Sequence, residues 1–341
     1  METRQLRHLK TIELPGNPLL KFDIGWVDEP TRRYYLADRS NARITVLDVD
    51  SLEYVGGLGE GRFTGVPASG GATAGPNGVL VLPDLQQAWA GDGDSTVKVI
   101  DVKSGELLDS VHTGGVNRVD ELAYDGQGVV LVANDQEKVP FATLISTSSD
   151  HAIIAKLDFP RASNGLHQPV WDPGTELFYL PVTEVDGIKA NGEIAAIDRA
   201  GNLVASYPVN ECQPAGLTVG PDGDLCIGCS KNAVAAGFSA RSLIMQLSTG
   251  AVVATIMEVG GSDEVWYNAG DGRYYLAASG MHDGPVLGVI DARTRSFVEN
   301  VPTAPDAHSV AADSRTNRVF VPVAPTAEHP RGGVAVFAAA G

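Results

Sequence analysis

Acidic residues and histidines recur along the chain at one position of a repeated pattern, each just before a short apolar segment. Asp120 and His167 occupy this position in two successive repeats. Asp263 and His308 occupy it in two later ones. A carboxylate beside an imidazole fixes the tautomer of the ring and raises its basicity. The pattern therefore predicts acid–base catalysis, with either histidine as the base and an aspartate that orients it.

The same position, which we call the ring position, can be followed through seven repeats separated by 43 to 54 residues. Each repeat holds an apolar strand, a turn of Asp, Pro or Gly, a second strand rich in Tyr, Val and Leu, and a third strand. Short alternating segments bounded by turn residues are typical of β-strands. The seven ring positions are Asp23, Asn77, Asp120, His167, Ala215, Asp263 and His308.

A period of about 40–50 residues is typical of a four-stranded propeller blade, and seven such blades account for 341 residues. The sequence therefore predicts an all-β fold, a seven-bladed β-propeller that forms one domain over residues 1–341. The last repeat supplies only three strands, so we expect an N-terminal strand to complete it and close the ring. The predicted blades are 20–56, 71–114, 116–158, 166–208, 213–257, 262–301, and 306–338 together with 6–14.

In a propeller the first strand of every blade lines a central channel, so the ring positions meet at one channel mouth. Because side chains alternate along a strand, we expect that Asp120 and Glu121 do not both face the channel. The same argument applies to Asp263 and Glu264. Register with the histidines favours Asp120 and Asp263 as catalytic residues, and the two glutamates are candidates for substrate binding.

The ends of the second strands should lie on the same face as the ring positions. Asn134 and Glu184 stand there before long insertions, and such loops can wall a pocket. We expect both residues, together with Asn77, to contact a substrate. Asp38 and Asp92 also end second strands, and we expect them to be solvated surface residues.

Alternatively, the residues at the channel mouth could bind a divalent cation of unknown identity. His167, His308 and Asn77 are the candidate ligands, and the cation would polarise a carbonyl group or activate water. The alternative is a purely structural role, in which an Asp or Asn beside Gly caps a turn and each histidine donates a hydrogen bond to a backbone carbonyl.

The repeats resemble the YVTN-repeat, lactonase-like group of seven-bladed propellers over essentially the whole chain. PNG at 76–78 and PDG at 221–223 are also similar to the gluconolactonase/regucalcin family. These resemblances imply a fold shared by lactone hydrolases, lactonising enzymes, lyases and non-catalytic binding proteins. The second family holds a channel metal with acidic and Asn ligands, and Asn77 is the matching position. Histidine at two other ring positions departs from that pattern and argues against a simple calcium-type oxygen cage.

Composition excludes several classes of partner and cofactor. The formal net charge of −17 argues against nucleic acid and anionic membrane surfaces. A hydrophobic fraction of 43% is enough for a substantial core. The sequence contains no Walker loop, GxSxG elbow, HExxH motif or CxxCH motif, so we expect no nucleotide and no haem. The predicted partner is a small-molecule substrate, and the sequence does not specify an oligomeric state.

Three cysteines are too few for a disulfide scaffold. Cys212 precedes the fifth blade and Cys229 ends its second strand, so they can form a disulfide in an exported protein or remain thiols near the site. Cys226 is expected to pack as a small apolar residue. The first 16 residues lack an apolar core of signal-peptide length, so we expect a cytoplasmic chain, or an exported one if a signal preceded it.

The sequence thus predicts an enzyme that acts on a small molecule at the channel mouth. Hydrolysis or formation of a lactone is the most concrete version, and a lyase or isomerase that removes a proton next to a carbonyl would use the same residues. The alternative is a non-catalytic propeller that binds a ligand or a protein.

Overall fold

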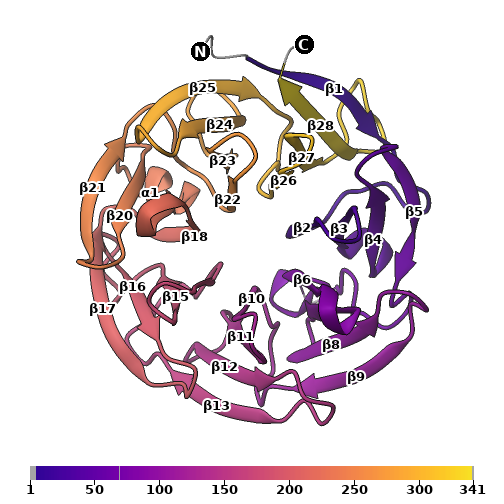
Figure 1. The fold of residues 1–341 in the computed structure, drawn as a ribbon, viewed down its shortest axis with the longest axis horizontal. Coiled ribbons are helices and arrows are strands. Elements are labelled where there is room, and N and C mark those ends of the chain that lie inside the picture. Colours follow the sequence, from indigo (N-terminus) through magenta and orange to yellow (C-terminus); the bar gives the residue numbers. More distant parts are fainter. Residues whose placement is uncertain (1–4, 69, 340–341) are drawn as a thin grey trace.

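Seven antiparallel four-stranded sheets surround a central axis in the computed structural model, which describes residues 5–68 and 70–339 (Figure 1). The chain passes once around the ring, and each of the first six sheets takes its strands in sequence order. Each blade is a meander of four antiparallel strands. Residues 43 to 54 positions apart in the sequence therefore occupy equivalent positions beside the axis in successive blades. The predicted seven-bladed all-β propeller is confirmed.

The strands of blades 1 to 3 are β2 (Gly25–Asp28), β3 (Arg33–Asp38), β4 (Arg43–Asp48), β5 (Glu53–Leu58), β6 (Val79–Leu82), β7 (Gln87–Gly91), β8 (Thr96–Asp101), β9 (Leu107–His112), β10 (Leu122–Tyr124), β11 (Val129–Asn134), β12 (Phe141–Ser146) and β13 (Ile153–Asp158). Those of blades 4 and 5 are β14 (Val170–Asp172), β15 (Leu177–Val182), β16 (Asn191–Ile197), β17 (Leu203–Asn210), β18 (Pro214–Val219), β19 (Asp224–Cys229), β20 (Ser242–Gln246) and β21 (Ala251–Ile256). Those of blades 6 and 7 are β22 (Val265–Asn268), β23 (Arg273–Ala278), β24 (Val286–Asp291), β25 (Ser296–Pro302), β26 (Ala311–Asp313), β27 (Arg318–Val323), β28 (Gly333–Ala339) and β1 (Leu6–Ile12). The helical elements are α1 (Lys231–Ala235) and the 3-10 turns η1 (Arg39–Asn41), η2 (Gly71–Thr73), η3 (Pro83–Leu85) and η4 (Pro221–Gly223).

The N-terminal strand β1 closes the ring, as the sequence predicted. It pairs antiparallel with β28, from Leu6 opposite Ala339 to Ile12 opposite Val334. Blade 7 therefore combines the two ends of the chain, and this places blade 1 directly beside it (Figure 1). This pairing completes the seventh blade with a fourth strand, and a closed ring of blades leaves only short, protected strand edges.

The core lies between neighbouring sheets, and the outermost strands are the least buried. The second and third strands are almost wholly buried, whereas outer strands such as β13 alternate between half-buried and exposed side chains. Trp89, Tyr34 and Tyr274 are among the largest fully buried side chains. The second and third strands are rich in apolar residues on both faces because a neighbouring sheet covers each face.

A glycine lets the innermost strands approach one another closely. The N–H of Gly78 donates to the carbonyl of Asp120 at 2.8 Å. A Cβ on Gly78 would lie 2.4 Å from that same oxygen, a separation that real side chains do not reach. Gly78 therefore helps to fix the backbone of Asp120 at the axis.

Two acids expected at the surface are buried instead. Asp38 accepts hydrogen bonds from the Asn41 N–H (3.1 Å) and the Thr45 hydroxyl (2.9 Å). Asp92 accepts from the N–H and the hydroxyl of Thr64. Both aspartates are fully buried, so the prediction of solvated acids is wrong. The polar groups of the turns beside these strand ends require acceptors, and the carboxylates supply them.

A disulfide and a buried thiol account for the three cysteines. Cys212, just before β18, and Cys229, the last residue of β19, form a disulfide within blade 5. Cys226 is free and buried, and burial raises the pKa of its thiol. Among the described residues, no helix has the length and apolar character needed to cross a bilayer.

An ion pair joins blade 7 to blade 1. The guanidinium of Arg32 contacts both oxygens of Asp313, one of them at 3.0 Å, and also contacts Asp50. The Asp313 side chain is fully buried and that of Arg32 is 13% exposed. Burial alone would raise the pKa of Asp313, but the bonds from Arg32 and Thr316 hold it below its ordinary value.

Asp313→Asn should therefore lower the free energy of unfolding by about 2–4 kcal/mol at pH 7, because it leaves a buried guanidinium partly unpaired. Because the pKa of Asp313 is lower in the folded state, its carboxylate stabilises the fold at pH values above the ordinary aspartate pKa of about 4. This stability is lost as the pH falls through the lower pKa of the folded state. Urea unfolding should show the two proteins converging at acid pH. Asp186→Asn, which breaks the exposed pair with Arg161, should change stability by less than about 1 kcal/mol. Equal effects of the two substitutions would contradict this account.

Candidate functional site

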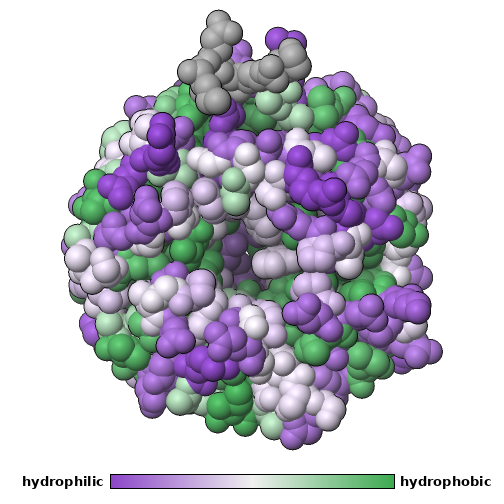
Figure 2. All heavy atoms as spheres, in the orientation of Figure 1, coloured by the Kyte–Doolittle hydropathy of each residue, from purple (hydrophilic) through white to green (hydrophobic). Residues whose placement is uncertain are grey.

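Equivalent backbone hydrogen bonds hold the ring positions at one end of the channel. The N–H of Asp23 donates to Ala37, that of Asp120 to Ala133, and that of Asp263 to Ala277. In each blade the acceptor lies near the end of the second strand, so the residue before the first strand returns to the same height. The sequence register of the ring is thereby reproduced in three dimensions. Figure 2 shows that the molecule is hollowed at the centre of the ring.

Two arginines, which the sequence analysis missed, balance the acids of the mouth. Arg39 pairs with Asp23, and its Nε donates to the side-chain oxygen of Asn77 at 3.0 Å. Arg118 pairs with Asp120 at 3.0 Å and with Asp135 at 2.8 Å. The signal was present in the sequence, since Arg39 directly follows a second strand and Arg118 stands two residues before a ring position.

His308 pairs with Asp23 rather than with the expected Asp263. Its Nε2 lies 3.3 Å from Asp23 Oδ1, and its Nδ1 lies 2.7 Å from the carbonyl oxygen of Asp306. Phe22 stacks on the ring at 4.9 Å between centroids. The reason for the different partner is ring closure, which sets blade 1 beside blade 7.

The partners of His308 favour a doubly protonated ring. A backbone carbonyl only accepts, so Nδ1 carries a proton, while Nε2 faces a carboxylate that also accepts. Burial alone would lower the pKa of His308, but the bond to Asp23 and the charges of Asp23 and Asp263 raise it. Burial alone would raise the pKa of Asp23, whereas Arg39 and His308 hold it well below its ordinary value. This arrangement suits an electrostatic role better than that of a free base.

His167 lies in a cluster with two adjacent acids. One ligand atom each from Asp120, Glu121 and His167 lies within 4.8 Å of the others. The Nδ1 of His167 is also 3.9 Å from Asp263 Oδ1. The expectation that Asp120 and Glu121 cannot both face the channel is wrong. Both residues precede β10, which begins at Leu122, so the alternation of a pleated strand does not apply to them.

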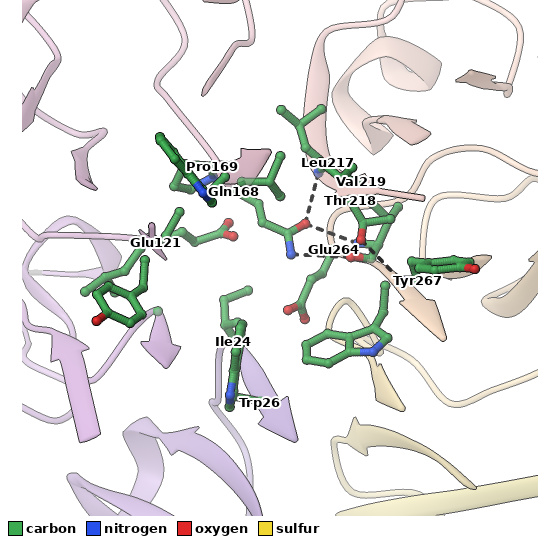
Figure 3. A pocket seen from close by; sticks show the side chains of 18 of the residues that line it. Ile24, Trp26, Glu121, Gln168, Pro169, Leu217, Thr218, Val219, Glu264 and Tyr267 are labelled. Atoms are coloured by element: carbon green, nitrogen blue, oxygen red, sulfur yellow. Dashed lines mark hydrogen bonds between the residues drawn. The ribbon is translucent and has the colours of Figure 1, made fainter. Parts of the chain in front are cut away.

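Asp263 and Glu264 also both face the channel, at different depths. Asp263 lines a mouth cavity of about 230 Å³ with Asp23, Arg39, Arg118, Lys231 and His308. Glu264 and Glu121 line an inner cavity of about 280 Å³ on the same axis. Figure 3 shows the side chains of Glu121, Gln168 and Glu264 pointing toward one another in that inner cavity.

The two glutamates of the inner cavity are buried acids. Burial raises the pKa of Glu264 well above its ordinary value, although the Ser309 hydroxyl and the Val310 N–H (2.9 Å) donate to its carboxylate. Burial, with the charges of Asp120 and Glu264, likewise raises the pKa of Glu121 well above its ordinary value. The Oε2 atom of Glu121 is buried and has no hydrogen-bond partner among the described residues.

The remaining predicted residues do not join this cluster. Asn77 is fully buried, and its side chain is engaged by Arg39 and by the carbonyl of Val119 at 2.7 Å. Asn134 donates to Thr113 at 2.9 Å within the joint between blades 2 and 3. Glu184 bonds to Ser163 in a peripheral loop. In this arrangement Asn77 positions Arg39 and has no oxygen left to face a cation.

The comparisons with known proteins support the fold alone. No family model matches the chain, and no curated protein matches it. Among solved structures, a chain in the crystal structure of the mitotic checkpoint complex has a TM-score of 0.73 and 12% sequence identity, and the match covers 100% of this chain and 94% of that chain. At this identity the likeness concerns the propeller architecture and not its chemistry.

Proposed function

We propose that this propeller is a metal-assisted enzyme whose small-molecule substrate binds on the channel axis, with hydrolysis of a lactone or ester as its reaction. The observation that carries the proposal is the convergence of Asp120, Glu121 and His167 within 4.8 Å. These residues come from two neighbouring blades. Resemblance to lactonase-like propellers supports the choice of substrate class.

The donor set fits a divalent cation. Two carboxylates and one imidazole are ligands that several divalent metals accept. Arg118 occupies Asp120 Oδ2, which leaves the other oxygen of that carboxylate available. Glu121 offers a buried oxygen without a partner, and such an atom is costly unless a ligand satisfies it. A cation held there would polarise a carbonyl group or lower the pKa of a bound water.

The mouth cavity supplies the groups that a hydrolytic transition state needs. Arg39, Arg118 and His308 surround it, and these donors can stabilise negative charge that develops on a substrate oxygen. The carboxylate of Asp263 lies near His167 on another side of the ring, with its Oδ1 3.9 Å from His167 Nδ1. Asp23 and Arg39 hold their mutual geometry through a buried pair, so the donors are positioned before a substrate arrives.

A non-catalytic ligand-binding propeller is the second candidate. It is favoured by the fact that the charged groups of the mouth already pair with one another, Arg39 with Asp23 and Arg118 with Asp120 and Asp135. Under that reading the cavity would select a ligand by shape and charge and leave it unchanged.

Metal removal separates the two functions. We expect the purified protein to contain about one divalent metal ion per chain. Prolonged dialysis against EDTA should abolish hydrolysis of an active compound found in a panel of lactones and esters, and added Mn²⁺ or Zn²⁺ should restore it. Turnover that is unaffected by complete metal removal would exclude the metal-assisted reaction. Binding of a compound without any turnover would favour the second candidate.

A further inference from the structure

The inner cavity has walls that differ sharply from those of the mouth. Its five aromatic side chains come from blades 1, 3, 4 and 6, and they surround about 280 Å³. They are Trp26, Tyr124, Trp171, Trp266 and Tyr267. The rings of Trp26 and Trp266 meet edge to face at 5.2 Å between centroids. The cavity size is near the lower end of the range for ligand pockets, about 300–1,000 Å³.

Two carboxylates stand in this aromatic cavity without a basic partner. Glu264 is 1% exposed and Glu121 is 5% exposed. Among the described residues that line the cavity there is no Lys, Arg or His. The Oε2 of Glu121 has no hydrogen-bond partner in the described part of the chain. Figure 3 shows both carboxylates directed into the cavity, beside Ile24 and Trp26.

Two other polar side chains of the cavity, Gln168 and Thr218, already form hydrogen bonds with the backbone. The Gln168 side-chain oxygen accepts from the N–H groups of Leu217 (3.0 Å) and Val265 (3.3 Å). The Thr218 hydroxyl accepts from the N–H of Tyr267 at 3.1 Å. These bonds join blades 4, 5 and 6 around the cavity, so neither side chain offsets the two carboxylates.

This combination selects for one kind of ligand. A protonated amine donates strong hydrogen bonds to carboxylates, and aromatic faces attract the same cation. A bound cation favours the ionised form of both carboxyl groups, whose pKa burial otherwise raises. An anion would be repelled by the ionised carboxylates, and a neutral apolar molecule would leave both acids desolvated and unpaired.

From these contacts we infer that the inner cavity is a binding site for a small organic ammonium ion with an apolar body. The ammonium group lies against Glu264 and Glu121, and the apolar body lies between the aromatic rings. This goes beyond the proposed function, because it holds whether or not the neighbouring cluster binds a metal ion. Glu121 lies at the boundary of the two sites, because it belongs to the cluster and also lines the inner cavity.

Three probes of one shape and different charge test the inference on the unmodified protein. Phenethylammonium, phenethyl alcohol and hydrocinnamate are titrated by calorimetry at pH 7. The ammonium should bind at least about tenfold more tightly than the alcohol, as expected for one charge-assisted hydrogen bond, and the anion should not bind. Trp26, Trp171 and Trp266 line the cavity, so the ammonium should also change tryptophan emission. Equal affinity for the ammonium and the alcohol would overturn the site.

Variants distinguish this site from the metal cluster. Glu264→Gln should weaken binding of the ammonium by about tenfold and leave the alcohol unaffected, whereas Glu53→Gln on the exposed outer strand of blade 1 should match wild type. His167→Ala should retain ammonium binding even where it loses metal binding. Displacement of the ammonium by Mn²⁺ in His167→Ala would show that the cavity is a metal site and would refute the inference. Unchanged ammonium affinity in a folded Glu264→Gln protein would refute it as well.

Discussion

Glu121→Gln and His167→Ala should each lower the affinity of the protein for Mn²⁺ by about 100-fold or more and remove turnover that depends on the metal. His167→Ala deletes one of the three donors that converge within 4.8 Å, and Glu121→Gln replaces a charged carboxylate with a weaker, neutral amide oxygen. Loss of a residue that merely orients a ligand costs about 10–100-fold in metal affinity or activity, and loss of a ligand should cost at least as much. Calorimetric titration of the metal-free proteins with Mn²⁺ provides the measurement.

This prediction has two controls: a substitution that keeps the shape of the side chain, and a substitution far from the cluster. Glu121→Gln keeps the volume of the side chain, so circular dichroism and thermal unfolding should confirm an intact propeller. Glu53→Gln removes the same charge from an exposed strand and should bind Mn²⁺ as wild type does. If Glu121→Gln and Glu53→Gln bound the metal equally well, Glu121 would not be a ligand.

Glu264→Gln should stabilise the protein at neutral and alkaline pH. Glu264 is buried beside the charges of Asp23, Asp263 and Glu121, and in the part of the chain that the structure describes no basic residue lines its cavity. Its raised pKa means that the folded state binds a proton that the unfolded state releases. The full stability of the fold is therefore present at pH values below the ordinary glutamate pKa of about 4. Part of it is lost as the pH rises toward the raised pKa of Glu264.

The magnitude of this effect follows from proton linkage. Between the two pKa values the folded state loses about 1.4 kcal/mol per pH unit for each such group. Gln carries no titrating proton, and its side-chain oxygen can accept both hydrogen bonds that Ser309 and Val310 donate. Urea unfolding between pH 5 and pH 8 should therefore show a smaller pH slope for Glu264→Gln than for wild type. A variant that is less stable than wild type across this range would contradict the account, because it would mean that the ionised carboxylate stabilises the fold.

The fold was predictable because its determinants are local and repeated. Apolar strands, turn residues and a constant period specify one blade, and the missing strand of the seventh repeat could be matched with the N-terminal segment now seen as β1. Each blade needs only its neighbours, so seven similar stretches of sequence lead to a closed ring. The register of the ring positions was predictable for the same reason.

The chemistry of the site was less predictable because it depends on side-chain direction. His308 was matched with Asp263 from the preceding blade, whereas ring closure gives it Asp23 from the other end of the chain. Strand alternation placed Glu121 among the substrate-binding candidates and not with the catalytic residues, although the strand begins only at the next residue. Arg39 and Arg118 approach the axis from the connecting segments, which a comparison of ring positions does not cover. The repeat does not specify which acidic residues form ion pairs and which lack a basic partner, because this depends on contacts in the folded protein.

The central claim is that Asp120, Glu121 and His167 together hold a divalent cation, and electron spin-echo spectroscopy of bound Mn²⁺ tests it most directly. The wild-type protein should show the nitrogen modulation of one directly coordinated imidazole. The modulation should persist in His308→Ala, because His308 bonds to Asp23 and Asp306 outside the cluster, and it should vanish in His167→Ala. Mn²⁺ bound without nitrogen modulation, or modulation that persists in His167→Ala, would contradict the account.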